Sequence, residues 1–274
     1  MSDNAQLLSA AQLAAAKAAV FLRSQEGRMK PGDWTAKGKA DYVTEVDKEA
    51  ERIITEGLLR AHPGSVVIGE ELNPDPGLPS HVGRRTSHED VVWIVDPLDG
   101  TTNFLHGFPV YSVSIAATVD WELVAGVVHH VPRDIVHSAT KGGGAWQDGQ
   151  RLAVSTRVDP PHALISTGVP FKEMEQWPVF HRQLEAVASA AAGLRRPGSA
   201  ALDLCDVAAG RVDGFWELKL APWDVAAGTL IVREAGGMVS DLAGNADVLR
   251  HNSIAAGNPA IHAWLLRTLA TASG

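Results

Sequence analysis

The first part of the chain has the apolar spacing of two helices. Over residues 5–22 alanine dominates and larger apolar residues are interspersed, which gives strong helix propensity. A second helix is predicted to begin at Thr44, because small and apolar residues then recur at helical spacing and line one face. These residues are Ala50, Ile53, Ile54, Gly57 and Leu58. Residues 38–41, between the two helices, are predicted to form a loop.

The middle of the chain is predicted to be predominantly sheet. Residues 65–68 form a short β-type run, and residues 91–95 form a continuous apolar run of the kind buried on both faces, which ends at Asp96-Pro97. The segment 73–85, rich in proline and glycine, is predicted to be a surface loop. Further strands are expected over 110–119, 123–131 and 135–139, with a hairpin turn at Asp148-Gly149.

Helical and strand patterns alternate after Pro170. Helices are expected over 178–191, 200–209 and 225–235, and a strand over 214–218. Mixed runs of this kind indicate an α+β fold in which helices and two sheets form layers. We expect a single domain over residues 1–274, and a soft subdomain boundary near residue 150 is the alternative.

Composition and charge narrow the class of protein. The 274 residues are 45% hydrophobic and 20% charged, which excludes a disordered chain. The net charge of -8 argues against direct binding of nucleic acid or anionic lipid. A single cysteine, Cys205, excludes an internal disulfide framework and a cysteine-built zinc site. The N-terminus is polar and acidic, and no uncharged apolar stretch reaches about 18 residues, so we expect a cytoplasmic protein without a membrane span.

Carboxylates lie where the predicted apolar elements meet loops. Glu70 and Glu71 follow one strand-like run, Asp96 and Asp99 end another, and Asp224 opens a late helix. Any one of them alone is better explained as a turn residue or a helix cap. If these ends converge, however, their oxygen-only donors suit a hard divalent cation, Mg²⁺ above all.

Residues 96–103 combine several of these features in the sequence DPLDGTTN. A buried strand delivers Asp96, Pro97 fixes the next turn, and Asp99-Gly100 leads into a helix or tight turn whose amides would face an anion. Metal ligands and a phosphate cradle are therefore expected side by side. That layout is the one needed for metal-assisted phosphoryl transfer.

Five blocks of sequence resemble the inositol monophosphatase family. They are residues 69–71, 93–104 and 223–237, together with 41–47 and 196–204, which are similar to its bacterial branch. The resemblance implies a layered αβαβα sandwich, Mg²⁺-dependent hydrolysis of a small phosphate monoester, inhibition by lithium, and a homodimer. The phosphorylated polyol that it favours as substrate is inositol 1-phosphate.

The resemblance also implies roles for individual residues. Two or three Mg²⁺ ions are expected, the first on Glu70, Asp96 and the Leu98 carbonyl, and the second on Asp96, Asp99 and Asp224. Glu71 matches a position in or beside the first metal's ligands. Thr101, hydrogen-bonded to Asp47, corresponds to the residues that activate water, and Gly100, Thr101 and Thr102 to those that hold phosphate. The positions that match contacts to the alcohol part of the substrate are Asp99, Arg195, Ser199, Ala200 and Glu217.

Several of these assignments have a plainer alternative. Asp47 lies three residues after Thr44, so the pair also fits a helix cap, which is compatible with a catalytic role. Glu217 could be a solvated edge residue, and Arg195 with Arg196 an exposed basic patch. The family's lysine before the Asp47 helix has two competing counterparts, Lys37 and Lys39.

Other functions are left open by the sequence. The substrate could instead be fructose bisphosphate, histidinol phosphate or a nucleotide phosphate. A haloacid-dehalogenase-type phosphatase would need an Asp-x-Asp spacing, which Asp96 and Asp99 miss by one residue. The third alternative, by resemblance alone, is a regulatory binding module associated with transcription machinery.

Overall fold

The computed structural model describes residues 4–28, 35–38, 41–72, 91–171 and 173–273, and of 35–38 and 41–43 the backbone alone. The predicted loop 73–85 and Lys39 lie outside these residues. The helices are α1 (Asn4–Gln25), α2 (Glu45–Ala61), α3 (Thr101–Leu105), α4 (Trp177–Ala190), α5 (Ala200–Ala208), α6 (Pro222–Glu234) and α7 (Pro259–Ser273). Short 3₁₀ turns lie at Val131–Arg133, Pro160–His162, Met174–Gln176 and Val248–Arg250.

Two large sheets and a small hairpin contain the described strands. The seven-stranded sheet has the order β3 (Val66–Gly69), β4 (Val91–Asp99), β5 (Ser112–Val119), β6 (Glu122–His130), β7 (Ile135–Thr140), β8 (Gly144–Gln147) and β9 (Gln150–Arg151). The five-stranded sheet has the order β11 (Gly193–Arg195), β10 (Leu164–Thr167), β12 (Gly214–Leu218), β14 (Ser253–Gly257) and β13 (Met238–Ser240). The hairpin pairs β1 (Thr35–Gly38) with β2 (Asp41–Val43).

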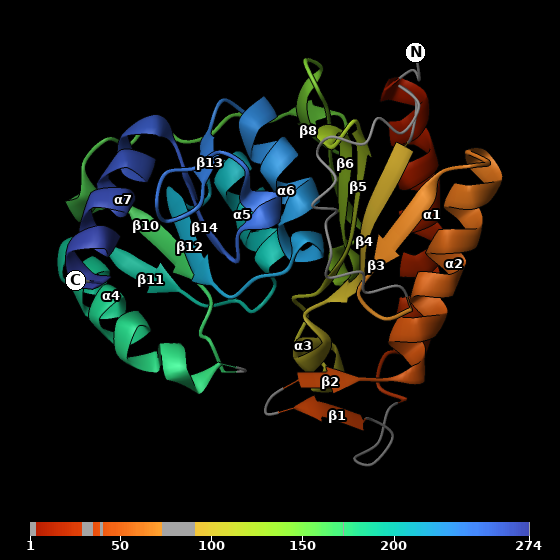
Figure 1. Cartoon of the computed structure of the whole chain (residues 1–274), viewed down its shortest axis with the longest axis horizontal. Coiled ribbons are helices and arrows are strands. Elements are labelled where there is room, and N and C mark those ends of the chain that lie inside the picture. The colour runs from red at the N-terminus through yellow and green to blue at the C-terminus, as the bar shows by residue number, and fades with distance from the viewer. Residues whose placement is uncertain (1–3, 29–34, 39–40, 73–90, 172, 274) are drawn as a thin grey trace.

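The sheets and helices form five layers (Figure 1). Helices α1 and α2 cover the outer face of the seven-stranded sheet, α5 and α6 lie between the two sheets, and α4 and α7 cover the five-stranded sheet. This arrangement confirms the expected α+β fold and the αβαβα sandwich. Each sheet buries both faces, which explains why strands such as β4 are apolar along nearly their whole length.

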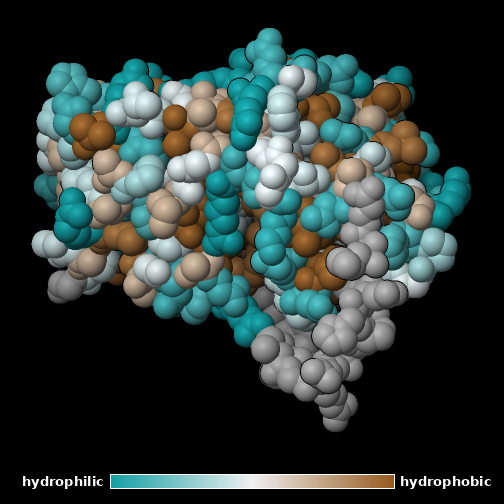
Figure 2. Space-filling view, turned by 90° about the horizontal axis from the view of Figure 1, so that it is seen from above, coloured by the Kyte–Doolittle hydropathy of each residue, from teal (hydrophilic) through white to brown (hydrophobic). Residues whose placement is uncertain are grey.

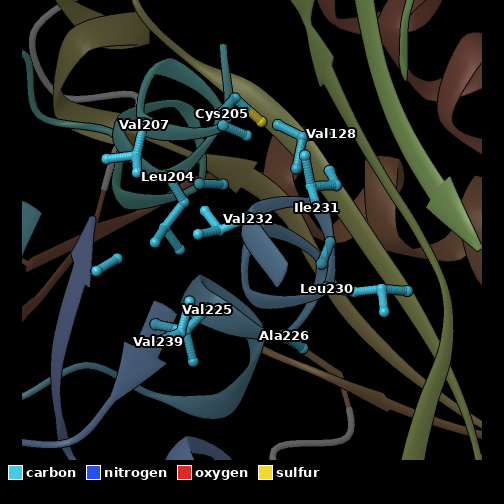
Figure 3. Packing of buried hydrophobic residues seen from close by; sticks show 14 of the residues in the cluster. Val128, Leu204, Cys205, Val207, Val225, Ala226, Leu230, Ile231, Val232 and Val239 are labelled. Atoms are coloured by element: carbon cyan, nitrogen blue, oxygen red, sulfur yellow. The ribbon is translucent and has the colours of Figure 1, made fainter. Parts of the chain in front are cut away.

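Figure 3 shows buried hydrophobic side chains of the middle layer, such as Leu204 of α5 and Ile231 of α6. The layer packs closely because glycines lie where the elements meet. A Cβ placed on Gly228 of α6 would lie 2.5 Å from a methyl carbon of Leu204 on α5. A Cβ on Gly126 of β6 would lie 3.1 Å from the Ala227 carbonyl oxygen. Helix α6 therefore lies directly against both α5 and the larger sheet.

Helix α1 is the element in the described residues that is long and apolar enough to cross a membrane by length and composition. A core helix has the same composition, and seven residues of α1 are buried against α2 and the seven-stranded sheet. On the face seen in Figure 2, hydrophobic residues lie in small groups between hydrophilic ones. That pattern is ordinary for a protein surface.

The structure differs from the sequence-based expectations in several elements. Strand β4 continues through Pro97 to Asp99, with an irregular register against β5 after Asp96, where the sequence predicted an end. Gly38 and Asp41, expected in a loop, are paired in the β1–β2 hairpin. Besides β1 and β2, four strands and a helix had no predicted counterpart: β10, β11, β13, β14 and α7. The hairpin turn at Asp148-Gly149 is confirmed, since both residues have positive φ between β8 and β9.

Candidate active site

Asp96 lies at the centre of an acidic cluster. Its side chain is 1% exposed, and its Oδ1 accepts a hydrogen bond of 2.9 Å from the backbone N–H of Leu98. Burial raises the pKa of Asp96 well above its usual value, and the nearby charges of Glu70, Asp99 and Asp224 raise it further. Four of the five carboxylates that the sequence placed at element ends, all but Glu71, are thus electrostatic neighbours.

The register of the larger sheet explains how Glu70 reaches this cluster. Strands β3 and β4 are parallel, and Gly69 pairs with Val95. The next residues along the chain, Glu70 just after β3 and Asp96 within β4, therefore lie side by side. This pairing brings together carboxylates that are far apart in the sequence.

Helix α3 begins directly after β4 and turns sharply at Gly100. Gly100 has φ of +96°, and a Cβ there would lie 3.0 Å from the carbonyl oxygen of Val110, so both conformation and space require glycine. The side-chain amide of Asn103 donates to the carbonyls of Val110 and Pro197, at 2.6 and 2.9 Å. Asn103 thereby ties α3 to the segment that leads into α5.

Asp47 lies behind Thr101 and is 1% exposed. The Thr101 hydroxyl donates towards Asp47 Oδ1 at 3.2 Å and the Leu98 carbonyl at 3.1 Å. Asp47 also closes a capping box with Thr44 at the start of α2, accepting from the Thr44 backbone N–H at 2.9 Å. Burial raises the pKa of Asp47, against the lowering effect of the bonds from Thr44 and Thr101. The cap and the contact with Thr101 coexist.

The other two carboxylates are held at helix starts. Asp99 Oδ2 accepts from the Ser199 hydroxyl at 2.6 Å and from the Ala201 backbone N–H at 2.9 Å, at the beginning of α5. Asp224 Oδ2 accepts from the Ala221 N–H at 2.6 Å, at the beginning of α6. The beginning of α5 thus holds Asp99 by hydrogen bonds, and the beginning of α6 carries Asp224. Both carboxylates line the same cavity.

Glu70, Asp96, Asp99, Thr101 and Asp224 line a cavity of about 430 Å³ between the two sheets, and Asp47 is not part of the lining. The cavity has an acidic wall and an apolar wall, the latter formed by Val169, Pro170, Phe171, Leu218 and Leu220. At its edge the Arg196 guanidinium carbon lies 5.2 Å from the centre of the Phe171 ring. A cation on an aromatic face at this distance is a favourable contact.

Glu217 reaches the cavity from β12. A Cβ on Gly168 would lie 1.9 Å from the Glu217 carboxyl, so glycine leaves the room that this side chain fills. Behind it, burial raises the pKa of Asp203 on α5, and the charge of Glu217 raises it further. Glu217 is therefore a half-buried cavity residue with an acidic neighbour.

The structure gathers most of the residues selected from the sequence. Those that line the cavity are Glu70, Asp96, Leu98, Asp99, Gly100, Thr101, Thr102, Ser199, Ala200, Glu217 and Asp224. Arg195 does not line it; this exposed residue donates to the Leu194 carbonyl, and its neighbour Arg196 lines the cavity instead. Glu71 lies outside the lining as well, and its backbone N–H bonds to Glu51. Lys37 lies on β1, where the backbone alone is described.

Sequence reasoning missed several residues at the site. Asn103 lies inside the recognised motif, so its amide could have been considered as a loop anchor. His106 and Lys219 line the cavity without any sequence pattern that points to them. Glu51 had one signal, since a charged residue four positions after Asp47 falls on the same face of the helix.

The donor set suits a hard divalent cation. All four acidic residues and the Leu98 carbonyl offer oxygen. Burial and the neighbouring charges raise the pKa of Asp96, and a bound cation would stabilise its ionised form. Among the described residues, no three acidic, histidine or cysteine side chains stand as a complete set of metal ligands. Protein donors bond to Oδ1 of Asp96 and to Oδ2 of both Asp99 and Asp224.

The whole chain is similar to known proteins in sequence and in structure. The model of the inositol monophosphatase family matches residues 3–273. An inositol-1-monophosphatase of Mesorhizobium japonicum is 42% identical over 96% of both chains, and the Nus factor SuhB of Salmonella typhimurium is 43% identical over 82% of this chain and 81% of its own. The crystal structure of the extragenic suppressor protein SuhB from Bartonella henselae has a TM-score of 0.85 and 40% identity, covering 96% of this chain and 98% of that one. The chain belongs to the inositol monophosphatase family.

Proposed function

We propose that the protein is a Mg²⁺-dependent phosphatase that hydrolyses inositol 1-phosphate to myo-inositol and phosphate by attack of water. The observation that carries the proposal is the meeting of four carboxylates and the start of α3 in one cavity. Its volume of about 430 Å³ is in the range that holds a small organic ligand. The name of the Mesorhizobium relative supports the same activity.

The metal would be held by oxygen ligands on three segments. We assign Glu70, Asp96 and the Leu98 carbonyl to one ion, and Asp96, Asp99 and Asp224 to a second, with two or three ions in all. Bound Mg²⁺ would polarise the phosphate oxygens and lower the pKa of a water molecule.

Thr101 and Asp47 are assigned to the proton of the attacking water. The Thr101 hydroxyl donates its hydrogen to Asp47. The oxygen of the same hydroxyl can therefore accept a hydrogen bond from a water molecule in the cavity. Because burial raises the pKa of Asp47, its carboxylate is a better proton acceptor than an exposed aspartate. The first amides of α3, at Gly100, Thr101 and Thr102, would hold the phosphate, since the first N–H groups of a helix have no partner within it.

The alcohol part of the substrate would contact Ser199, Ala200 and Glu217, which also line the cavity. The carboxylate of Glu217 can accept hydrogen bonds from the hydroxyls of a polyol. Arg195, which the resemblance also implies, would have to contact substrate from outside the cavity lining. We therefore assign Glu217 the larger part in substrate choice.

A phosphate-release screen tests the substrate. Inositol 1-phosphate, fructose bisphosphate, histidinol phosphate and nucleotide monophosphates are compared with and without Mg²⁺ and Li⁺. We expect the highest kcat/KM for inositol 1-phosphate, release that depends on Mg²⁺, and inhibition by Li⁺. A higher kcat/KM for another ester would replace inositol 1-phosphate as the substrate, and full activity after chelation would refute the metal mechanism.

Asp96→Asn tests the metal site itself. Losing the shared ligand removes several kcal/mol of charge stabilisation, so kcat/KM should fall by more than about 100-fold at saturating Mg²⁺. Asp206→Asn is the matched control, because Asp206 is an acid on α5 that pairs with Arg211 outside the cavity. Near-normal turnover by Asp96→Asn with intact fold would remove the proposal.

A second candidate function comes from the relatives named Nus factor SuhB. A regulatory module associated with transcription machinery would act by binding rather than by hydrolysis. The inactive Asp96→Asn variant separates the two: transcription machinery captured from cell extract equally by variant and wild type would support the binding function. Absence of capture by wild type would eliminate it.

We also propose that the chain forms a homodimer in the cytoplasm. The homodimer is implied by the family resemblance, and a single cysteine agrees with the reducing conditions of the cytoplasm. Sedimentation velocity tests the first: a species of twice the mass of one chain would support the dimer, and a single monomeric species at micromolar concentration would refute it.

A further inference from the structure

Helix α2 carries a second buried acid that the proposed reaction does not use. Glu51 follows Asp47 by one helical turn, so both point from the same face of α2 into the protein. Its side chain is 0% exposed. A carboxylate is rarely buried to this degree unless it is hydrogen-bonded, so its contacts indicate its purpose.

The Glu51 carboxylate accepts hydrogen bonds from the backbone just after β3. Its Oε2 accepts from the N–H of Glu71 at 2.7 Å, and its Oε1 accepts from the N–H of Leu72 at 3.0 Å. Each oxygen of the carboxylate therefore receives one amide from consecutive residues. Hydrogen bonds to an ionised acceptor are the stronger kind and fix the turn that they close.

Gly69 supplies the space for this contact. A Cβ on Gly69 would lie 2.2 Å from Oε1 and 2.4 Å from the carboxyl carbon of Glu51. Gly69 has no positive φ that would itself require glycine. The missing side chain is thus explained by the carboxylate that occupies its place.

The turn held by Glu51 is the one that carries Glu70. Gly69 before it is fixed by pairing with Val95, and Glu71 after it is fixed by Glu51. Glu70 is therefore held on both sides by backbone contacts, while its side chain lines the cavity beside Asp96.

We propose that Glu51 is a positioning residue that sets the affinity of the site for Mg²⁺ by fixing the backbone of Glu70. This inference rests on the proposed function, which makes Glu70 a metal ligand. Groups that orient metal ligands without touching the metal commonly change metal affinity by about 10- to 100-fold when they are removed.

Both oxygens of the carboxylate are needed. In Glu51→Gln the side-chain NH₂ would replace one acceptor and face an amide N–H, so donor would oppose donor. The substitution is nearly isosteric and leaves the helix and the surrounding packing unchanged. It therefore tests the two hydrogen bonds rather than the volume of the side chain.

The experiment measures Mg²⁺ binding directly by isothermal titration calorimetry on the purified full chain. We expect the dissociation constant for Mg²⁺ to rise by about 10- to 100-fold in Glu51→Gln, with a smaller change in kcat at saturating metal. Glu49→Gln is the matched control, since Glu49 lies on the same helix, is half-exposed and pairs with Arg52. Its Mg²⁺ affinity should stay within about threefold of wild type.

A second variant approaches the same contact from the other side. Gly69→Ala should displace the Glu51 carboxylate and weaken Mg²⁺ binding by a similar factor. Because both substitutions break one contact, the double variant should bind Mg²⁺ about as weakly as either single variant. Additive losses would overturn the proposal.

Hydrogen exchange tests the contact in the unaltered protein, so the proposal does not depend on the variants folding. The amides of Glu71 and Leu72 should exchange about 10- to 100-fold more slowly than free amides, with Mg²⁺ absent. Exchange at the free rate would overturn the proposal. If wild type binds Mg²⁺ and a folded Glu51→Gln binds it equally well, this inference alone fails; if wild type binds no Mg²⁺, the proposed function fails with it.

Discussion

At the scale of single residues, Thr101 is the point where the helix cap and the proposed chemistry meet. Its one hydroxyl hydrogen has two acceptors, Asp47 and the Leu98 carbonyl, at nearly equal distances. Asp47 is itself held by Thr44, so the acceptor cannot follow a displaced hydroxyl without breaking the cap of α2. The orientation of the Thr101 hydroxyl is therefore fixed by Asp47 at the beginning of α2.

A substitution that removes the Thr101 hydroxyl should reduce turnover much more than one that keeps it. We expect Thr101→Ala to lower kcat by about 10²- to 10⁴-fold, the usual contribution of a positioned proton-transfer group. Thr101→Ser keeps the donor and should stay within about tenfold of wild type, since it loses only the methyl group that restricts the rotamer. Steady-state kinetics at saturating Mg²⁺ measure both. Equal kcat for Thr101→Ala and wild type would remove Thr101 and Asp47 from the reaction.

At the scale of elements, glycines set how closely the helices approach their neighbours. Gly228 lies on α6 with Leu204 of α5 above it, and any Cβ there would overlap a side chain in the packed middle layer. Gly57 on α2 is different, because a Cβ there would lie 3.5 Å from Ala14, an ordinary contact distance. The same residue type thus has a packing role in one helix and none in the other.

Alanine at these two positions should change stability in opposite directions. Gly228→Ala overpacks the core and should lower the free energy of unfolding by about 1–3 kcal/mol. Gly57→Ala removes backbone entropy from the unfolded chain and should raise it by up to about 1 kcal/mol. Urea denaturation followed by circular dichroism measures both values. A neutral Gly228→Ala would mean that α5 and α6 can separate at little cost.

The elements that were predictable from sequence are those with long, uniform patterns. Alanine-rich α1, the amphipathic face of α2 and the apolar run of β4 were all recognised because each extends over several turns or residue pairs. The strands β10, β11 and β13 have three or four residues each, too few for a pattern to stand out. Their strand conformation comes from pairing with neighbours far away in the sequence, which no local signal encodes.

The lack of a local signal for contacts between distant segments also explains which site residues could be predicted from the sequence. Asp96, Asp99 and Glu70 could be selected because each ends a recognisable strand or turn, and the structure brings them together. Arg195 and Arg196 could not be separated, since successive strand residues point to opposite sides and the end of β11 was not predicted. The contacts of Glu51 depend on the approach of α2 to β3, which exists only in the folded chain.

At the scale of the whole molecule, buried histidines make folding sensitive to acid. His137 on β7 is 2% exposed, and in the part of the chain described neither ring nitrogen has a hydrogen-bond partner. Burial, assisted by the nearby charge of Arg211, lowers the pKa of His137 to about 4. Between pH 4 and pH 6.5, therefore, His137 is protonated in the unfolded chain, where the pKa of histidine is near 6.5, and neutral in the folded protein.

Stability should fall as the pH drops from about 6.5 to about 4. A histidine whose pKa is lowered on folding leaves stability complete above the unfolded pKa, and it removes on the order of 3 kcal/mol once the pH reaches the folded pKa. His137→Leu takes away this proton and should flatten that part of the pH profile. Urea denaturation at a series of pH values compares the two proteins; parallel profiles would show that His137 does not titrate in this way.

The acidic cluster links function to stability in the opposite sense. Because the pKa of Asp96 is raised on folding, the folded protein favours its protonated form, and above the unfolded value the ionised carboxylate opposes folding. Asn at this position keeps an oxygen for the Leu98 N–H and removes the charge. Without metal, Asp96→Asn should therefore be more stable than wild type at pH 7, by about 0.5–2 kcal/mol.

Mg²⁺ should reverse that order. A cation that binds the folded state alone stabilises wild type by about 2.7 kcal/mol at a concentration of 100 times its dissociation constant, whereas Asp96→Asn has lost the shared ligand and should gain little. Thermal unfolding with a chelator and with increasing Mg²⁺ measures the crossing. If the two melting temperatures rise in parallel with Mg²⁺, the stabilising ion does not bind at Asp96; if wild type is the more stable protein without metal, the four carboxylates do not oppose folding, and relief of their repulsion cannot be what draws a cation to this cavity.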